Sequence, residues 1–86
     1  MKESEIQRKI TLQLEKKGWV VVKLIKTTMN GIPDLMALKC GKTVFIEVKT
    51  DKGVTSELQK FRHEKLRSQG FTVHVCTSFD EISLFF

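Results

Sequence analysis

Three residues in the middle of the chain have the types and spacing needed to act on a phosphate group. Asp34 follows the only proline, and Glu47 and Lys49 stand two residues apart in an apolar stretch. Side chains two residues apart lie on the same face of a β-strand. Carboxylates bind hard divalent cations, and a lysine beside them can act on a phosphate or on the attacking water. These residues therefore favour metal-assisted phosphodiester chemistry, if the fold brings them together.

The segment from Asp34 to Glu47 predicts a hairpin that sets the two carboxylates opposite each other. Two apolar runs, residues 34–39 and 42–49, flank Cys40 and Gly41, which suits a two-residue turn. Each step back along the first strand is then matched by one step forward along the second, which pairs Asp34 with Glu47. Opposed side chains have Cβ atoms about 4.5–5.5 Å apart, and like charges in such a pair are destabilising. We therefore expect a hard divalent cation such as Mg²⁺ to bind between them.

The residues before this hairpin predict a helix, a strand and a loop. Residues 4–17 have apolar positions at helical spacing, with Ser4 and Gln7 as a capping box and Gly18 as the stop. Residues 19–25 are β-branched and nearly all apolar, which is typical of an interior strand covered on both faces. Residues 27–33 contain Asn-Gly and the proline, and they predict a loop that leads into Asp34.

The residues after the hairpin predict a second helix and a fourth strand. Residues 51–53 are a polar break, residues 56–69 suit a helix closed by Gly70, and residues 71–76 suit a strand. The tail, residues 78–86, suits a short helix or an added strand, and its apolar side chains need a cover such as a partner subunit. The predicted fold is an α/β domain spanning residues 1–86, with α-β-β-β-α-β order and a mixed four-stranded sheet flanked by helices.

The charge balance favours an anionic partner. Fifteen Lys and Arg residues against ten Asp and Glu give a formal charge of +5, which favours nucleic acid or an anionic membrane surface. No apolar run approaches the roughly 20 residues of a membrane span, and the charged N-terminus has no signal-peptide core, so we expect a cytoplasmic protein. Cys40 and Cys76 lack the spacing of a zinc site and are too few for a disulfide scaffold.

The combination of Gly31-Ile32-Pro33-Asp34 with Glu47-Val48-Lys49 resembles the PD-(D/E)xK nuclease superfamily, which has a restriction-endonuclease-like core of the same element order. Within it, the chain looks most like the VRR-NUC (virus-type replication-repair nuclease) domain. The resemblance implies that Asp34, Glu47 and the carbonyl of Val48 bind Mg²⁺ or Mn²⁺. It also implies that Lys49 is catalytic, either as a base or as an electrostatic stabiliser.

Two further site residues are implied by the resemblance, and each has a structural alternative. Glu5 would join the metal site from the first helix, but a first-turn glutamate also stabilises a helix N-terminus. Gln59 would orient Lys49 or a phosphate from the second helix, but Ser56 and Gln59 also form an S-x-x-Q capping box.

Exposed cations are the expected contacts to a DNA backbone, because phosphate binding needs positive charge in range but little exact geometry. The candidates, with simple solubility as the alternative for each, are Lys23, Lys26, Lys52, Lys60, Arg62 and His63. Neither His63 nor His74 is assigned to a metal site, because a lone histidine is more often a surface or core residue.

Stand-alone domains of this family resemble phage and viral nucleases of recombination and repair, which would place a phage-encoded chain in the host cytoplasm. One small chain suits a homodimer with two active sites, and such symmetry matches a four-way (Holliday) DNA junction. The leading hypothesis is a metal-dependent, junction-resolving DNA endonuclease. The alternatives are a flap or general DNA nuclease, and a non-catalytic DNA-binding module that kept the nuclease fold.

Overall fold

The computed structural model describes all 86 residues and contains two helices and four strands in the predicted order. The elements are α1 (Glu3–Lys16), β1 (Val20–Lys23), β2 (Leu35–Lys39), β3 (Lys42–Val48), α2 (Glu57–Ser68) and β4 (Thr72–Cys76). The tail forms two short 3₁₀ turns, η1 (Phe79–Glu81) and η2 (Ser83–Phe85). None of the helices is long and apolar enough to cross a bilayer.

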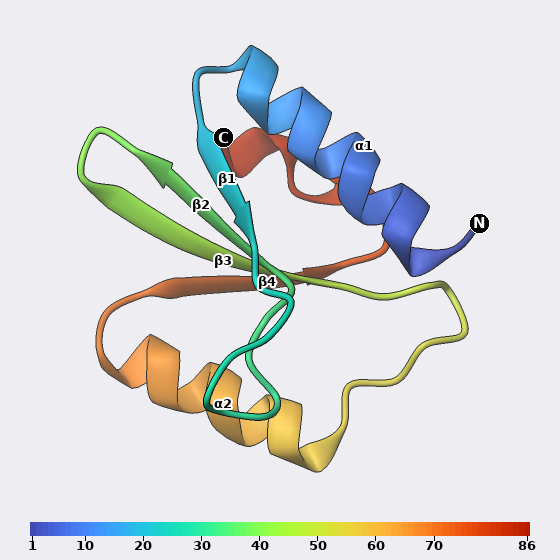
Figure 1. Cartoon of the computed structure of the whole chain (residues 1–86), viewed down its shortest axis with the longest axis vertical. Helices are drawn as coiled ribbons and strands as arrows, with labels where there is room; N and C mark the ends of the chain where they lie inside the picture. Colours follow the sequence, from blue (N-terminus) through green and yellow to red (C-terminus); the bar gives the residue numbers. More distant parts are fainter.

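The four strands form one mixed sheet that lies between the two helices (Figure 1). The strand order is β1-β2-β3-β4, with antiparallel pairing from β1 to β3 and parallel pairing of β3 with β4. The parallel pair is joined by the α2 crossover, as such a connection requires. The predicted α/β class, with its mixed four-stranded sheet and flanking helices, is confirmed.

The turn between β2 and β3 fixes the hairpin register. Cys40 and Gly41 both have positive φ, 50° and 78°, as in the two-residue turn that matches strand twist. Lys39 therefore pairs with Lys42, and the ladder runs to Leu35 opposite Ile46. This is the predicted register.

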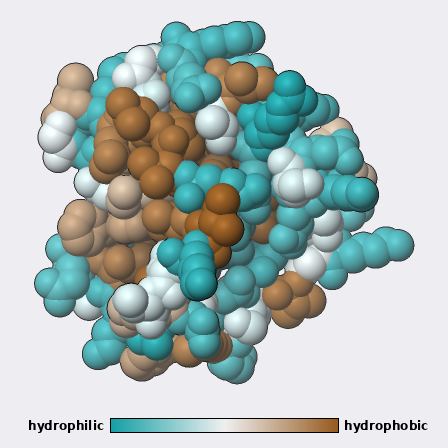
Figure 2. All heavy atoms as spheres, in the orientation of Figure 1, coloured by the Kyte–Doolittle hydropathy of each residue, from teal (hydrophilic) through white to brown (hydrophobic).

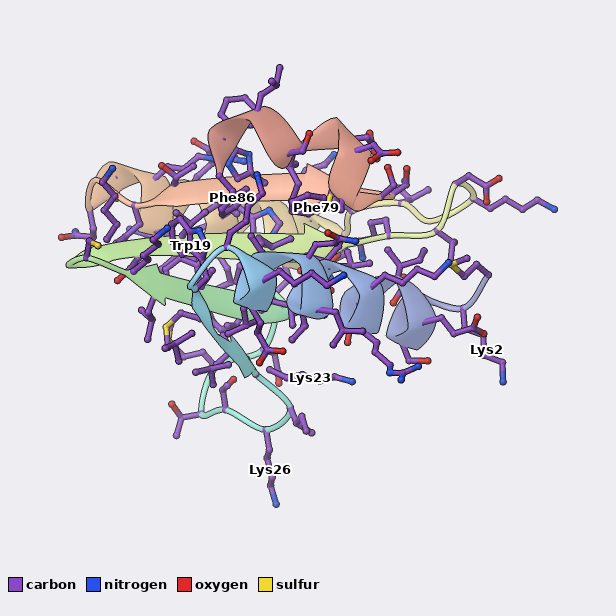
Figure 3. All side chains as sticks on the ribbon, turned by 90° about the horizontal axis from the view of Figure 1, so that it is seen from above. Lys2, Trp19, Lys23, Lys26, Phe79 and Phe86 are labelled. Atoms are coloured by element: carbon purple, nitrogen blue, oxygen red, sulfur yellow. The ribbon has the colours of Figure 1, made fainter.

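The hydrophobic core lies on the α1 side of the sheet. Ile10 and Leu14 of α1 are fully buried against Leu35, Ala37 and Ile46 of the sheet. The C-terminal turns close the same layer, where Trp19 meets the ring of Phe86 edge-on at 5.1 Å and Phe79 packs against the core (Figure 3). The other face carries α2, whose one buried residue is His63.

The predicted capping box at the start of the first helix is wrong. The helix begins at Glu3 with Lys2 as N-cap, and the Lys2 carbonyl accepts the N–H groups of Glu5 and Ile6. Ser4 thus lies inside the first turn and has a helical backbone, whereas an N-cap residue has an extended one. Gln7 is buried on the core side, and its Oε1 has no hydrogen-bond partner.

The prediction of an interior strand over residues 19–25 is also wrong. Strand β1 pairs only with β2 and forms one edge of the sheet. Helix α1 covers the face of Val21, whereas Val20 and Val22 on the other face are 61% and 37% exposed, because α2 packs near β4. Figure 2 shows an apolar surface on the side of the molecule where the β2–β3 hairpin lies.

The loop before Asp34 is held tightly against α2. Gly31 has a φ of +82°, and a Cβ there would lie 2.9 Å from Leu58 Cγ and 3.1 Å from the Leu58 carbonyl oxygen. Arg62 Nε also donates to the carbonyl of Asn30, at 2.9 Å. The loop can approach the helix this closely because residue 31 has no side chain.

Gly31→Ala tests this contact, with Gly41→Ala as its control. Gly41 has a similar φ of +78°, but a Cβ there meets nothing within 4 Å. We expect Gly41→Ala to lower the free energy of unfolding by about 1–2 kcal/mol through backbone strain alone. Gly31→Ala should cost about 1 kcal/mol more, because α2 must move. Urea unfolding measures both, and equal losses would contradict a close loop–helix contact.

Candidate active site

The β2–β3 hairpin brings Asp34 and Glu47 together at its open end. The pair follows Leu35 and Ile46 in the register, and Asp34 is the residue directly before β2. Asp34 Oδ2 accepts the backbone N–H of Val48 at 2.8 Å, so the aspartate side chain is tied to the opposite strand. The predicted opposition of the two residues therefore agrees with the backbone register and with a side-chain contact.

Glu47 is the buried centre of this cluster, with 2% of its surface exposed. Its Oε2 lies 3.5 Å from Lys49 Nζ and accepts a hydrogen bond from Gln59 Nε2 at 3.3 Å. Its Oε1 has no hydrogen-bond partner. One oxygen of this buried carboxylate therefore lacks a hydrogen bond within the chain.

The surroundings of Glu47 oppose its negative charge. The pKa of Glu47 is raised to about 8: burial contributes most, the neighbouring Asp34 carboxylate adds to the rise, and Lys49 only partly offsets the two. One lysine therefore does not neutralise two adjacent carboxylates. A divalent cation would supply the missing charge, and these oxygen donors are the type that Mg²⁺ and Mn²⁺ prefer.

Gln59 makes the contacts that either role would need, as a helix-capping residue or as a residue of the site. Ser56 Oγ accepts the Gln59 N–H at 3.1 Å, and Gln59 Oε1 accepts the Ser56 N–H at 2.9 Å, which completes a capping box. The same Oε1 accepts a hydrogen bond from Lys49 Nζ at 3.0 Å, while Nε2 donates to Glu47. The helix cap thus holds the amide where it orients Lys49 and Glu47.

Glu5 lies outside this cluster. It is exposed in the first turn of α1, and no three His, Cys, Asp or Glu side chains lie close enough together to hold a metal ion. The predicted metal role of Glu5 therefore gains no support. Val48 lies beside the site in sequence and donates its N–H to Asp34, and the metal-binding role of its carbonyl stays a prediction.

The predicted DNA-contacting cations differ in their exposure and in the contacts that they already make within the chain. Lys23, Lys26 and Lys52 are exposed, and Figure 3 shows Lys23 and Lys26 pointing away from the body of the molecule. Lys60 forms an exposed ion pair with Glu57 at 3.2 Å. Arg62 is half-buried, and its Nε–H donates a hydrogen bond to the loop before Asp34. Arg62 therefore has a structural contact in addition to any role with DNA.

The two histidines have different surroundings, and one of them belongs to the cluster. His63 is 2% exposed, so its prediction as a DNA-backbone contact is wrong, and its Nε2 lies 3.7 Å from Glu47 Oε1. Burial lowers the pKa of His63, and the positive charges of Arg67 and Lys49 lower it further. His74 lies on the other face, 4.7 Å from the Phe85 ring. The sequence signal for His63 was its position four residues after Gln59, one turn along the same helix face.

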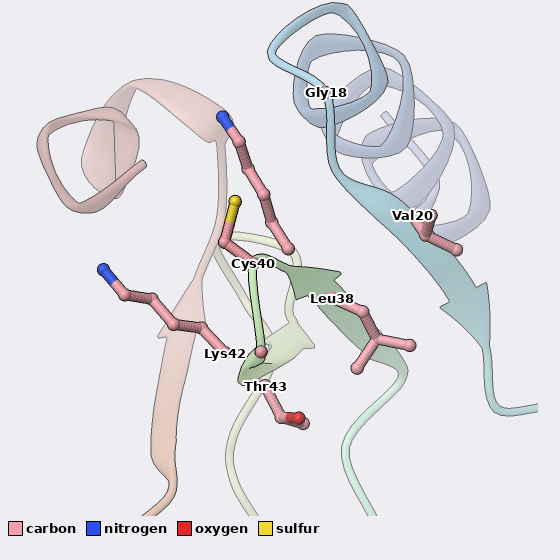
Figure 4. A pocket seen from close by; sticks show the side chains of 8 residues that line it. Gly18, Val20, Leu38, Cys40, Lys42 and Thr43 are labelled. Atoms are coloured by element: carbon pink, nitrogen blue, oxygen red, sulfur yellow. The ribbon is translucent and has the colours of Figure 1, made fainter.

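A surface hollow at the other end of the hairpin does not compete with this site. It is lined by Gly18, Val20, Leu38, Lys39, Cys40, Gly41, Lys42 and Thr43 (Figure 4). No carboxylate or imidazole faces it, so it lacks both the metal ligands and the acid–base groups of the Asp34–Glu47 cluster.

Comparison with known proteins finds the same family by sequence and by structure. The sequence model of the VRR-NUC domain matches residues 2–80. The chain is 29% identical over 85 residues to "Putative nuclease p44" of Acyrthosiphon pisum secondary endosymbiont phage 1, covering 98% of this chain and 91% of that protein. A solved VRR-NUC domain superposes with a TM-score of 0.83 at 31% identity, covering 94% of this chain and 89% of that one.

The raised pKa of Glu47 predicts how the stability of the metal-free protein depends on pH. Its folded pKa of about 8 lies above the ordinary value of 4.5, so between these values the folded chain holds a proton that the unfolded chain has lost. This contribution to the free energy of unfolding therefore falls as pH rises through that window. Glu47→Gln has no such proton and should gain stability over wild type by up to about 1.4 kcal/mol per pH unit.

Urea unfolding of both proteins in EDTA, at several pH values between about 5 and 8, measures this difference. Comparing the two proteins cancels contributions that they share, including that of His74 on the other face of the sheet. A difference that stays constant over the whole range would show that the pKa of Glu47 is not raised.

Proposed function

The chain belongs to the VRR-NUC family of the PD-(D/E)xK nuclease superfamily and is a nuclease domain, and from this we propose that it is a metal-dependent endonuclease that cuts branched DNA as a homodimer. The proposal treats residues 1–86 as one catalytic domain. The observation that carries the chemistry is the cluster of Asp34, Glu47 and Lys49 at the open end of one hairpin.

The residues present fit a hard divalent cation. Asp34 and Glu47 supply carboxylates, the Oε1 of Glu47 has no protein partner, and the carbonyl of Val48 is the third proposed ligand. A bound Mg²⁺ or Mn²⁺ would polarise the scissile phosphate and make a coordinated water more acidic.

Lys49 is the proposed catalytic partner of the metal ligands. Strand periodicity sends its side chain to the same face as Glu47, and Gln59 Oε1 holds its Nζ at 3.0 Å. From this position the ammonium can offset the charge that develops on the phosphoryl oxygens. After loss of a proton, the same nitrogen could accept one from the attacking water.

Two observations support the homodimer, and the branched substrate is proposed from the symmetry of that dimer. The outer edge of β1 has no strand partner within the chain, and Val20 and Val22 beside it are exposed. Uncovered edges and apolar faces are typical of surfaces that associate. A twofold dimer would present two equivalent sites, and a four-way junction presents two equivalent strands.

The first test is cleavage of matched four-way junction, flap and linear duplex DNA with Mg²⁺, Mn²⁺ or EDTA. We expect paired, symmetric cuts in the junction with either metal and none in EDTA, together with a dimer in sedimentation equilibrium. Cutting of all three substrates would indicate a general nuclease. Binding without cutting in either metal would indicate a DNA-binding module.

Asp34→Asn and Glu47→Gln are the matched controls for this test. Each removes a charge but keeps a side-chain oxygen, so the amide oxygen of the Asp34→Asn variant can still accept the Val48 N–H that holds the hairpin end. Cleavage should fall by about 100-fold or more, with little loss of DNA binding. Cleavage at the wild-type rate in both variants would rule out this site.

Ser56→Ala and Gln59→Ala separate the two roles of Gln59. Both break the capping box, and each should lower the free energy of unfolding by about 1 kcal/mol. Only Gln59→Ala also removes the bonds to Lys49 and Glu47, so it alone should slow cleavage, by about 10-fold or more. Equal cleavage rates in the two variants would mean that Gln59 is only a cap.

A further inference from the structure

Two buried polar atoms face each other in the site without a hydrogen bond. Glu47 Oε1 and His63 Nε2 lie 3.7 Å apart, and both side chains are 2% exposed. Neither atom has another partner. An N–H···O hydrogen bond spans about 2.7–3.2 Å, so the gap is only slightly too long for one.

This arrangement is unfavourable for stability alone. A buried donor or acceptor without a partner loses its hydrogen bonds to water and gains nothing in return. An apolar side chain of similar volume at position 63 would avoid that loss. Unpaired buried polar groups in a folded protein call for an explanation, and a role in the working state of the site is one.

The preceding turn of α2 already donates a hydrogen bond to Glu47, which indicates a similar role for His63. Gln59, one helical turn earlier, donates its Nε2–H to Glu47 Oε2 at 3.3 Å. His63 Nε2 faces the other oxygen of the same carboxylate. One helix face thus offers an N–H donor to each oxygen, and two such bonds would fix the plane of the carboxylate.

We propose that His63 is a positioning residue whose Nε2–H donates to Oε1 of the Glu47 carboxylate when Glu47 binds the metal ion. The inference rests on the proposed metal-dependent function. It assigns to His63 a hydrogen bond to the Glu47 carboxylate, which is itself the proposed metal ligand. His63 is not assigned as a ligand itself, because its Nε2 faces the Glu47 carboxylate oxygen to which it would donate. Residues that orient a ligand in this way typically change metal affinity 10- to 100-fold.

The experiment measures Mn²⁺ binding by isothermal titration calorimetry, without DNA, for wild type, His63→Leu and His63→Gln. Leucine keeps the volume without a donor, and glutamine carries an N–H at about the position of Nε2. We expect His63→Leu to match or exceed the metal-free stability of wild type but to bind Mn²⁺ about 10-fold or more weakly. His63→Gln should restore most of the affinity, and cleavage at saturating Mn²⁺ should follow the same order.

His63→Asn extends the test if the leucine variant does not fold. Asparagine is also polar but too short to bring its amide to the Nε2 position, so it should bind Mn²⁺ more weakly than His63→Gln. Equal Mn²⁺ affinity in wild type and His63→Leu, or in the Gln and Asn variants, would overturn the positioning role and leave the nuclease proposal intact. A wild-type protein that binds no Mn²⁺ and cuts DNA in EDTA would overturn both.

Discussion

The carboxylate of Glu47, buried beside that of Asp34, is the interaction on which the other features of the site depend. Burial and the adjacent negative charge both favour the protonated form of Glu47, and only Lys49 opposes them. The surrounding residues limit this strain without removing it: Asp34 is tied to the backbone of Val48, and Gln59 holds one oxygen of Glu47. The resting protein therefore keeps an arrangement that is poor for stability and well suited to a small, doubly charged cation.

Helix α2 controls this cluster although it contributes little to the core. Its one buried residue is His63, and Leu58 and Phe61 are 44% and 51% exposed. The capping box at Ser56 fixes where the helix begins, and that start determines the position of the Gln59 amide. The same few bonds thus define the end of a helix and the geometry of a site, which is why Gln59 could not be assigned to one role from the sequence.

The hairpin and the pairing of Asp34 with Glu47 were predictable from local sequence. Cys40-Gly41 suits a two-residue turn, and that turn fixes which residues of the two strands pair. The parts that were missed depend on tertiary context. The apolar run around Val20 is compatible with an interior strand, and only the packing of α2 near β4 leaves it at an edge. The burial of His63 depends likewise on how α2 docks, although its spacing from Gln59 places the two side chains on one helix face.

The two-residue turn also determines which changes of length the chain can accept. The exposed residues 25–29, before Asp34, and the exposed residues 51–54, before α2, lie where extra residues can bulge outward. An insertion between Cys40 and Gly41 that kept a two-residue turn would shift one strand by a residue, and such a shift moves every side chain to the opposite face of the sheet. It would turn Glu47 and Lys49 away from Asp34, or Leu35 and Ala37 out of the core. Length variation in related chains should therefore collect in those two connections and spare the hairpin tip.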